Sequence, residues 1–149
     1  MDDEAWMAEA IRLATEARNR GDEPFGALLV SDDESILEAR NAVNTDADVT
    51  QHAELRLISK ASRRLPAAAV AAASLYTSTE PCAMCCGAIY WAGVRHVVYG
   101  FPAHRLEALT GGVGIHRSSR DVLGDATGVV RIDGPVLEEA AAEPHRGFW

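Results

Sequence analysis

Three residues of metal-ligand type, one histidine and two cysteines, constrain the fold of this chain more than any other feature. His52 lies far along the chain from Cys82 and Cys85, so two distant segments must meet if the three residues act together. The cysteines have the C-x-x-C spacing of metal ligands. Three protein ligands leave one position of a tetrahedral zinc ion open, which is typical of catalytic rather than structural zinc sites. Glu54, two residues after the histidine, is then a carboxylate free for proton transfer.

The residues around these ligands indicate how they are held. Pro81 suits the first position of a helix, because its missing N–H would have no partner there. Cys82 and Cys85 would then share one face of the opening turns, where the helix dipole favours thiolate over thiol. A second helix would run from residue 51 to about residue 63 and begin at the His-x-Glu segment. We therefore expect two helix N-termini to face each other, with the thiolates carrying the negative charge between them.

Composition predicts a single domain in a reducing compartment. The chain has 149 residues, a normal size for one domain, and we expect that domain to span residues 1–149. Two of its three cysteines belong to the metal pattern, which leaves no disulfide framework. The N-terminus is acidic and lacks a basic-then-apolar signal region, and the alanine-rich run at residues 67–73 is too short to span a membrane. These features predict a soluble, cytoplasmic protein.

Helix and strand patterns alternate along the chain. Apolar spacing predicts a helix at residues 3–19 and a hairpin of strands at residues 25–30 and 36–41. After the helix at 51–63 and an alanine-rich connector, we expect a strand at 74–78, the cysteine helix to about 92, a strand at 94–99, a helix at 102–109, a last strand at 129–132 and an acidic helix at 135–142. Residues 110–128 are Gly-rich and predict a surface loop, since no strand leads into them and the lysine of a phosphate-binding loop is absent. This alternation predicts an α/β sandwich with a mixed sheet.

The motifs, taken in order, resemble the cytidine deaminase superfamily. The resemblance is to the branch that contains bacterial guanine deaminases, tRNA adenosine deaminases and fungal cytosine deaminases, and it covers about residues 5 to 110. Its most specific stretches are Glu23-Pro24-Phe25-Gly26-Ala27, Asn41, His52-Ala53-Glu54 and Thr79-Glu80-Pro81-Cys82-Ala83-Met84-Cys85-Cys86-Gly87-Ala88-Ile89-Tyr90-Trp91-Ala92.

This resemblance implies a fold, a cofactor and a mechanism. The fold is a three-layer α/β/α sandwich with a mixed five-stranded sheet, usually in a homodimer. His52, Cys82 and Cys85 would bind Zn²⁺, whereas Cys86 would be a packed or partly buried thiol. Zinc lowers the pKa of a bound water to roughly 7. Glu54 would take the water proton and deliver it to a ring nitrogen and later to the departing amine, which leaves as ammonia.

The resemblance also implies substrate-binding residues. Asn41 lies where the family places a side-chain amide that reaches the base, although it could instead end a strand and start a turn. Phe25 lies where an apolar or aromatic residue lines the pocket, or it belongs to the ordinary core. Phe101 and the C-terminal Phe148-Trp149 resemble the aromatic lids of fungal cytosine deaminases, unless the last two residues fray. Ala53, inside the His-x-Glu segment, completes this set.

Several substrates fit the motifs. Residues 87–92 look most like those of guanine deaminases, so guanine-like bases rank first. The acid that guanine deaminases carry after this strand has no clear counterpart in residues 101–107, which weakens the case for guanine. Cytosine-like bases rank second, because Phe101 and Phe148-Trp149 resemble the aromatic lids of fungal cytosine deaminases. A tRNA-binding enzyme should carry a basic footprint. The net charge of −8 therefore favours a free nucleobase or nucleoside over nucleic acid. A third hypothesis is a non-enzymatic zinc-binding module. It is weaker, because Glu54 and the open coordination position would then have no function.

Overall fold

A mixed five-stranded sheet forms the centre of the protein. The computed structural model describes residues 1–112, 114–115, 117–124 and 129–149. The strands are β1 (Gly26–Val30), β2 (Ile36–Arg40), β3 (Ser74–Thr79), β4 (His96–Phe101) and β5 (Arg131–Asp133). They are arranged in the order β2-β1-β3-β4-β5. β1 runs antiparallel to both of its neighbours, whereas β3, β4 and β5 run parallel to one another.

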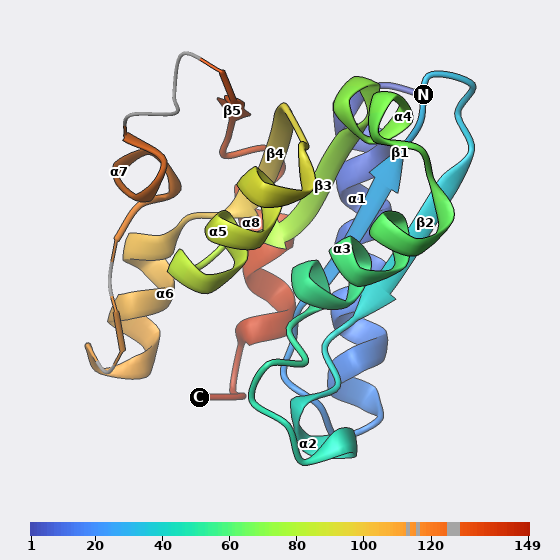
Figure 1. Cartoon of the computed structure of the whole chain (residues 1–149). Coiled ribbons are helices and arrows are strands. Elements are labelled where there is room, and N and C mark those ends of the chain that lie inside the picture. Colours follow the sequence, from blue (N-terminus) through green and yellow to red (C-terminus); the bar gives the residue numbers. More distant parts are fainter. Residues whose placement is uncertain (113, 116, 125–128) are drawn as a thin grey trace.

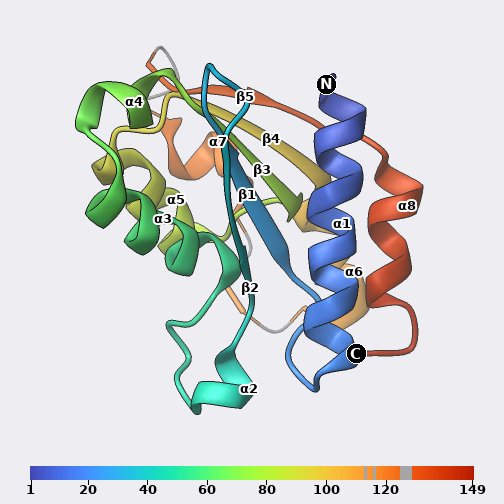
Figure 2. The ribbon, with the colours of Figure 1, turned by 90° about the vertical axis from the view of Figure 1, so that its right-hand side faces the viewer.

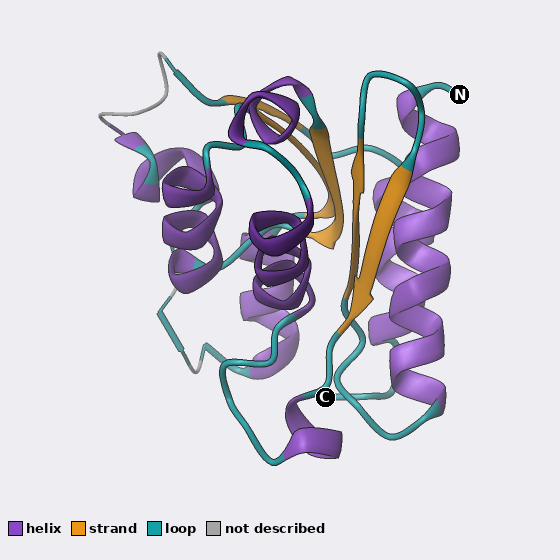
Figure 3. Ribbon diagram, turned by 45° about the vertical axis from the view of Figure 1, so that its right-hand side comes forward, coloured by secondary structure: helices purple, strands orange, loops and turns teal. Residues whose placement is uncertain are grey.

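Helices cover both faces of this sheet (Figures 1 and 2). One face carries α1 (Asp3–Asn19) and α8 (Glu138–Ala142), which continues into the 3₁₀ turn η2 (Glu143–His145). The opposite face carries α3 (Ala53–Arg64) and α5 (Ala83–Ala92), and Figure 3 shows the strands enclosed between the two helical layers. The shorter helices are α2 (Val43–Asp46), α4 (Ala67–Ala72), α6 (Ala103–Thr110) and α7 (Ser119–Val122). The expected three-layer α/β/α fold is confirmed.

Side-chain alternation along the strands divides the core into two layers. On β3, Tyr76 packs into the cluster beneath α1, whereas the preceding Leu75 packs into the cluster beneath α3 and α5. The same alternation holds for Leu28 and Leu29 on β1, because successive strand residues point to opposite faces. All of these side chains are buried, so both faces of these two strands are covered by helices.

Gly26 allows α1 to approach β1 closely. A Cβ atom at this position would lie 2.5 Å from the backbone nitrogen of Ala14 and 2.5 Å from the Cβ of Leu13. No side chain larger than hydrogen fits there without moving the helix, so glycine sets the distance between these two elements.

Two predicted helix starts differ from the structure by two residues. Pro81 does not occupy the first helical position, because the N-cap of α5 is Cys82 and the helix begins at Ala83. Likewise α3 begins at Ala53 rather than at Gln51. In both cases the metal-ligand residue itself occupies the extended cap position, which places its side chain beyond the first turn.

Other differences lie in the connections. The alanine-rich connector forms α4, and part of the expected loop at 110–128 forms α7, while residues 113, 116 and 125–128 lie outside the described part of the chain. The helix α2 was not predicted. The acidic helix ends at Ala142 as α-helix, but the turn η2 continues through Pro144. None of the helices in the described residues combines the length and apolar character needed to cross a bilayer.

Candidate metal and catalytic site

Two helix N-termini meet on one face of the sheet and bring the metal-ligand residues together. His52 is the N-cap of α3, Cys82 is the N-cap of α5, and Cys85 lies in the first turn of α5. The central strand β3 ends shortly before Cys82 and so delivers the cysteine helix to this point. The two helix N-termini therefore face each other, as expected.

The separations of the three ligand atoms suit one tetrahedral metal ion. The Nδ1 atom of His52 lies 3.6 Å from Sγ of Cys82 and 3.6 Å from Sγ of Cys85. All three ligand atoms lie within 4.8 Å of one another. Zinc–nitrogen and zinc–sulfur bonds of about 2.05 and 2.3 Å at tetrahedral angles would separate nitrogen from sulfur by about 3.6 Å. The donor set and its spacing thus fit zinc.

Charge is unevenly distributed between the two ligand thiols in the metal-free protein. A hydrogen bond from Cys85, together with the contact with His52, lowers the pKa of the Cys82 thiol to about 4. The same hydrogen bond and burial raise the pKa of Cys85. The interaction with Cys82 also raises the pKa of His52. These shifts favour the thiolate on Cys82 and the proton on Cys85, and a metal ion held by both sulfur atoms would require that proton to leave.

Glu54 is buried beside the ligands without belonging to them. It is 5% exposed, and its Oε1 accepts a hydrogen bond of 2.8 Å from the hydroxyl of Thr77 on β3. Burial raises the pKa of this carboxyl above its usual range. A carboxyl with a raised pKa next to a hydrolytic site is suited to accept and return a proton near neutral pH.

The third cysteine stands apart from the ligand group. Cys86 is fully buried in the core beneath α5, and its thiol donates to the carbonyl of Pro81 at 3.4 Å. Burial raises the pKa of this thiol to about 12, which keeps it protonated. The interpretation of Cys86 as a packed thiol is confirmed.

A small cavity of about 110 Å³ opens onto His52, Cys82 and Glu54. Its lining residues are Phe25, His52, Glu54, Thr79, Glu80, Cys82 and Leu106. The predicted residue Phe25 thus lies at this cavity. Thr79, Glu80 and Leu106 were not predicted to line it. Thr79 and Glu80 belong to the stretch that the motif covers, but the motif itself assigns them no contact.

Two other predicted substrate residues lie outside this lining. Asn41 follows β2 and is fully buried, with its amide donating to Glu23 at 3.2 Å and its Oδ1 accepting from the backbone of Val43 at 3.0 Å. It therefore holds the turn after the strand in this structure. Ala53 is buried as the first residue of α3. A role for either residue in substrate binding stays a prediction.

The aromatic residues of the predicted lid gather around His145. Phe101 stacks on its imidazole with centroids 4.8 Å apart, and Trp149 lies parallel to it at 6.3 Å. Phe25 meets it edge-on at 5.4 Å. Phe148 lies beneath the guanidinium of Arg18, at 5.7 Å. The last residues are therefore packed against the body of the protein, with Phe101 and Trp149 lining a neighbouring cavity of about 260 Å³.

The carboxylate of Glu80 forms hydrogen bonds with the starts of two helices near the cavity. Its Oε1 accepts from the backbone N–H of Ala103 at 2.9 Å, at the start of α6. Its Oε2 accepts from the backbone and hydroxyl of Ser119 at 2.7 and 2.5 Å, at the start of α7. One buried carboxylate thus joins the beginnings of three helices, α5, α6 and α7.

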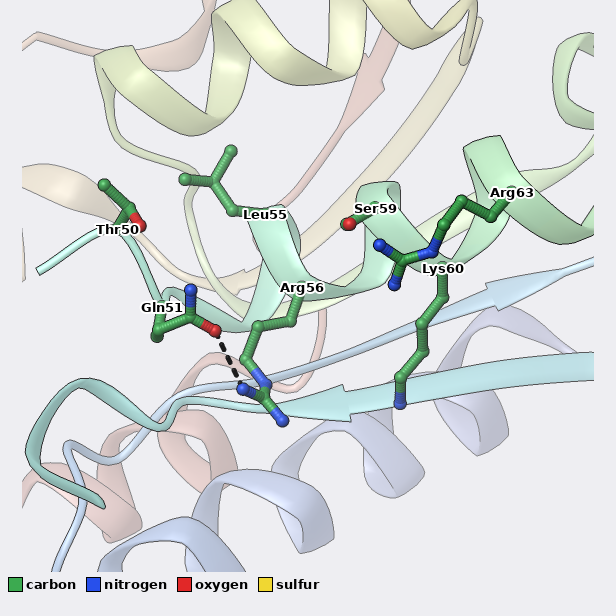
Figure 4. Close-up of a pocket in the computed structure, with 7 residues that line it drawn as sticks. All are labelled: Thr50, Gln51, Leu55, Arg56, Ser59, Lys60 and Arg63. Carbon is green, nitrogen blue, oxygen red and sulfur yellow. Dashed lines mark hydrogen bonds between the residues drawn. The ribbon is translucent and has the colours of Figure 1, made fainter. Parts of the chain in front are cut away.

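A larger cavity of about 380 Å³ lies on the outer side of α3 (Figure 4). Two of its three cations are engaged: Arg56 donates to Gln51 at 2.8 Å and to Asp46 at 3.0 Å, and Lys60 donates to the carbonyl of Glu38 at 2.7 Å. The lining contains no carboxylate, thiol or imidazole. We therefore place the chemistry at the smaller cavity, where the metal-ligand group and Glu54 converge.

Several known proteins are similar to this chain in sequence and fold. Residues 1–101 match the family model of the cytidine and deoxycytidylate deaminase zinc-binding region. A probable cytosine deaminase of Schizosaccharomyces pombe is 41% identical over 154 residues, which cover 99% of this chain and 92% of that protein. A guanine deaminase of Bacillus subtilis is 46% identical over 100 residues, which cover 66% of this chain and 64% of that protein. The solved structure of a guanine deaminase from Nitrosomonas europaea superposes with a TM-score of 0.82 at 26% identity, covering 97% of this chain and 83% of that one.

Proposed function

This chain belongs to the cytidine and deoxycytidylate deaminase family of zinc-binding proteins, and on that premise we propose that it hydrolytically deaminates a free nucleobase or nucleoside and releases ammonia. One observation carries the proposal: His52, Cys82 and the buried, non-ligating Glu54 line the same small cavity, and Cys85 lies within metal-ligand distance of His52 and Cys82. Three ligands and one open position are typical of hydrolytic zinc.

In this proposal His52, Cys82 and Cys85 hold the zinc ion. When bound, the ion supplies a nucleophilic water at neutral pH. Glu54 accepts one proton from that water and passes it to a ring nitrogen of the base. Once the oxygen has bonded to the carbon, Glu54 takes the second proton from that oxygen and gives it to the departing amine, so the products are a carbonyl and ammonia. Its burial beside Thr77 keeps the carboxyl in one place through these transfers. The cavity excludes bulk water and orients the planar base against Phe25.

Guanine-like bases are the first choice of substrate. The similarity to guanine deaminases in sequence and in fold supports them. A cytosine-type base is the second candidate, because the relative that matches nearly the whole chain is a probable cytosine deaminase. Both readings use the same zinc and carboxylate chemistry, and they differ only in the contacts made with the base.

The test is ammonia release by the zinc-loaded protein from guanine, cytosine, isocytosine, adenine and their nucleosides. A tRNA anticodon stem serves as the comparison substrate. We expect turnover of a free base or nucleoside and none of the tRNA. Deamination of the tRNA alone would replace this proposal with nucleic-acid editing and leave the zinc chemistry intact.

We also propose that the protein is a homodimer. Trp91 is 84% exposed and Met84 is 41% exposed on the outer side of α5. Tyr90 packs edge-on against Trp91 at 5.3 Å and extends this apolar surface. A large aromatic side chain left in water at a helix surface is typical of an interface.

A further inference from the structure

A chain of hydrogen bonds runs from the C-terminal tryptophan to the wall of the small cavity. The indole Nε1 of Trp149 donates to Nδ1 of His145 at 3.0 Å. On the other side of the ring, Nε2 of His145 lies 2.8 Å from the hydroxyl of Thr79. Thr79 is the last residue of β3 and lines the cavity together with His52 and Glu54.

The direction of these bonds follows from the chemistry of the first donor. An indole N–H can only donate, so Nδ1 of His145 must be an acceptor and carries no proton. The neutral ring then carries its proton on Nε2 and donates it to the hydroxyl oxygen of Thr79. Burial of the imidazole is consistent with the neutral form, since it is 2% exposed.

The hydroxyl proton of Thr79 is left without an acceptor in the described part of the chain. The Oγ1 atom of Thr79 accepts from His145, and no second partner for it occurs among the described residues. The residue is 3% exposed, so its hydroxyl is shielded from bulk water. Thr77, two residues earlier on the same face of β3, already uses its hydroxyl on Glu54. A buried donor at a cavity wall, without an acceptor of its own, is suited to a ligand.

We propose that the Thr79 hydroxyl donates a hydrogen bond to an acceptor atom of the bound base, and that His145 and Trp149 are positioning residues that keep it a donor. This inference rests on the proposed deaminase function and adds a specificity-determining residue to it. The acceptor class is a carbonyl oxygen. Guanine and cytosine each carry one, separated by one ring nitrogen from the carbon that bears the amine, whereas adenine has no carbonyl oxygen. Thr79 therefore favours oxo-bases over adenine.

The closing experiment compares two substrate pairs with matched variants of zinc-loaded protein. The pairs are guanine with 6-thioguanine and cytosine with 2-thiocytosine, because sulfur is a weak hydrogen-bond acceptor. Thr79→Val keeps the shape of the side chain and removes the hydroxyl, and Thr79→Ser restores it. Thr15→Val makes the same change on an exposed residue of α1. Zinc content and melting temperature verify that each variant is folded.

We expect Thr79→Val to lower kcat/KM on the preferred oxo-base about 10- to 100-fold. The oxo-to-thio preference of the wild type should fall toward unity in this variant, while Thr79→Ser and Thr15→Val retain it. Loss of activity on oxo- and thio-bases alike would indicate a structural role and overturn the inference. Unchanged activity on the oxo-base would overturn it while the proposed function stands. If the wild type deaminates no base or nucleoside, the proposed function fails, and this inference fails with it.

The two positioning residues are tested by substitutions that change their donor and acceptor pattern. Trp149→Phe keeps an aromatic ring and removes the indole N–H, so the imidazole can adopt the tautomer that accepts from Thr79. His145→Gln keeps an acceptor oxygen and an N–H donor, whereas His145→Leu keeps neither. We expect Trp149→Phe and His145→Leu to reduce the oxo-to-thio preference several-fold and His145→Gln to preserve it. An oxo-to-thio preference unchanged in both Trp149→Phe and His145→Leu would overturn the positioning role.

Discussion

At the scale of single residues, the proposed hydrolysis depends on one buried carboxyl. Glu54 lies beside the ligand group, accepts a hydrogen bond from Thr77 and has a pKa raised by burial. A carboxylate in this environment gains little from staying charged, so it can hold a proton during part of a reaction cycle. The ligand group alone would bind zinc without providing that proton relay.

Replacing Glu54 by Gln should abolish turnover while zinc remains bound. The amide keeps the shape of the side chain and the contact with Thr77, but it cannot accept and return a proton. We expect kcat to fall by about 10³-fold or more, measured by ammonia release together with zinc analysis. Near-normal turnover in Glu54→Gln would rule out this residue as the proton shuttle.

The two neighbouring cysteines should respond differently to the same change. Cys82→Ala removes a metal ligand, so we expect loss of the bound zinc, measured as metal per chain after dialysis. Cys86→Ala removes only a packed thiol and should retain about one zinc per chain, with a modest loss of stability. Retention of zinc by Cys82→Ala and its loss from Cys86→Ala would reverse the assignment.

His145 should make stability depend on pH. Burial, and to a lesser extent Arg18, lower the pKa of this imidazole to about 4. Between the ordinary value of about 6.5 and that value, the unfolded state binds a proton that the folded state does not. The free energy of unfolding should therefore fall by about 3 kcal/mol as pH drops from about 6.5 to about 4.

Urea unfolding of the wild type and of His145→Gln across this pH range measures the effect. The glutamine does not titrate, so the difference in stability between the two proteins should change with pH. A constant difference would show that His145 does not control the acid response.

The residues recognisable from the sequence are those whose chemistry fixes both type and spacing. A histidine, a glutamate and two cysteines at motif distances predict the metal-ligand group and Glu54. Thr77, Thr79 and His145 could not be found in this way, because a threonine in a strand or a histidine near a terminus carries no local signal. Their roles depend on which strand end and which chain end meet in space.

At the scale of elements, long patterned segments were predictable and short ones were not. The helices α1, α3 and α5 and all five strands follow from apolar spacing. The turns of helix in α2, α4 and α7 are too short to carry a period. The two-residue shifts at α5 and α3 arise because ligand residues serve as N-caps without a capping side-chain hydrogen bond.

The contact between α1 and β1 predicts a sharp glycine requirement. Gly26→Ala places a Cβ atom against the backbone of α1, so we expect a loss of about 2 kcal/mol or more, measured from the urea midpoint. Gly87→Ala on α5 is the matched control, since nothing lies within 4 Å of its added Cβ, and it should be neutral or stabilising. Equal effects at the two positions would contradict this account of helix–strand packing.

At the scale of the whole molecule, the exposed aromatic surface of α5 leads to a prediction about assembly. Trp91→Glu places a charge on this surface and should shift the protein to monomers at micromolar concentration, measured by light scattering after size exclusion. Ile36→Glu changes another exposed apolar residue, on the edge strand β2, and should leave the mass unchanged. A monomeric wild type would remove the basis for the homodimer.

The cysteines and the histidine of the metal-ligand group are attached to parts of the fold that differ in how firmly they are held. Cys82 and Cys85 follow β3, the middle strand of the sheet. This strand can leave the sheet only if its hydrogen bonds to both neighbouring strands break. His52 follows the connection that contains α2 and joins the edge strand β2 to α3. Local openings are most frequent where few buried contacts resist them. If zinc is bound here, its removal by a chelator should therefore begin at His52. The chelator would then act on an ion held by Cys82 and Cys85.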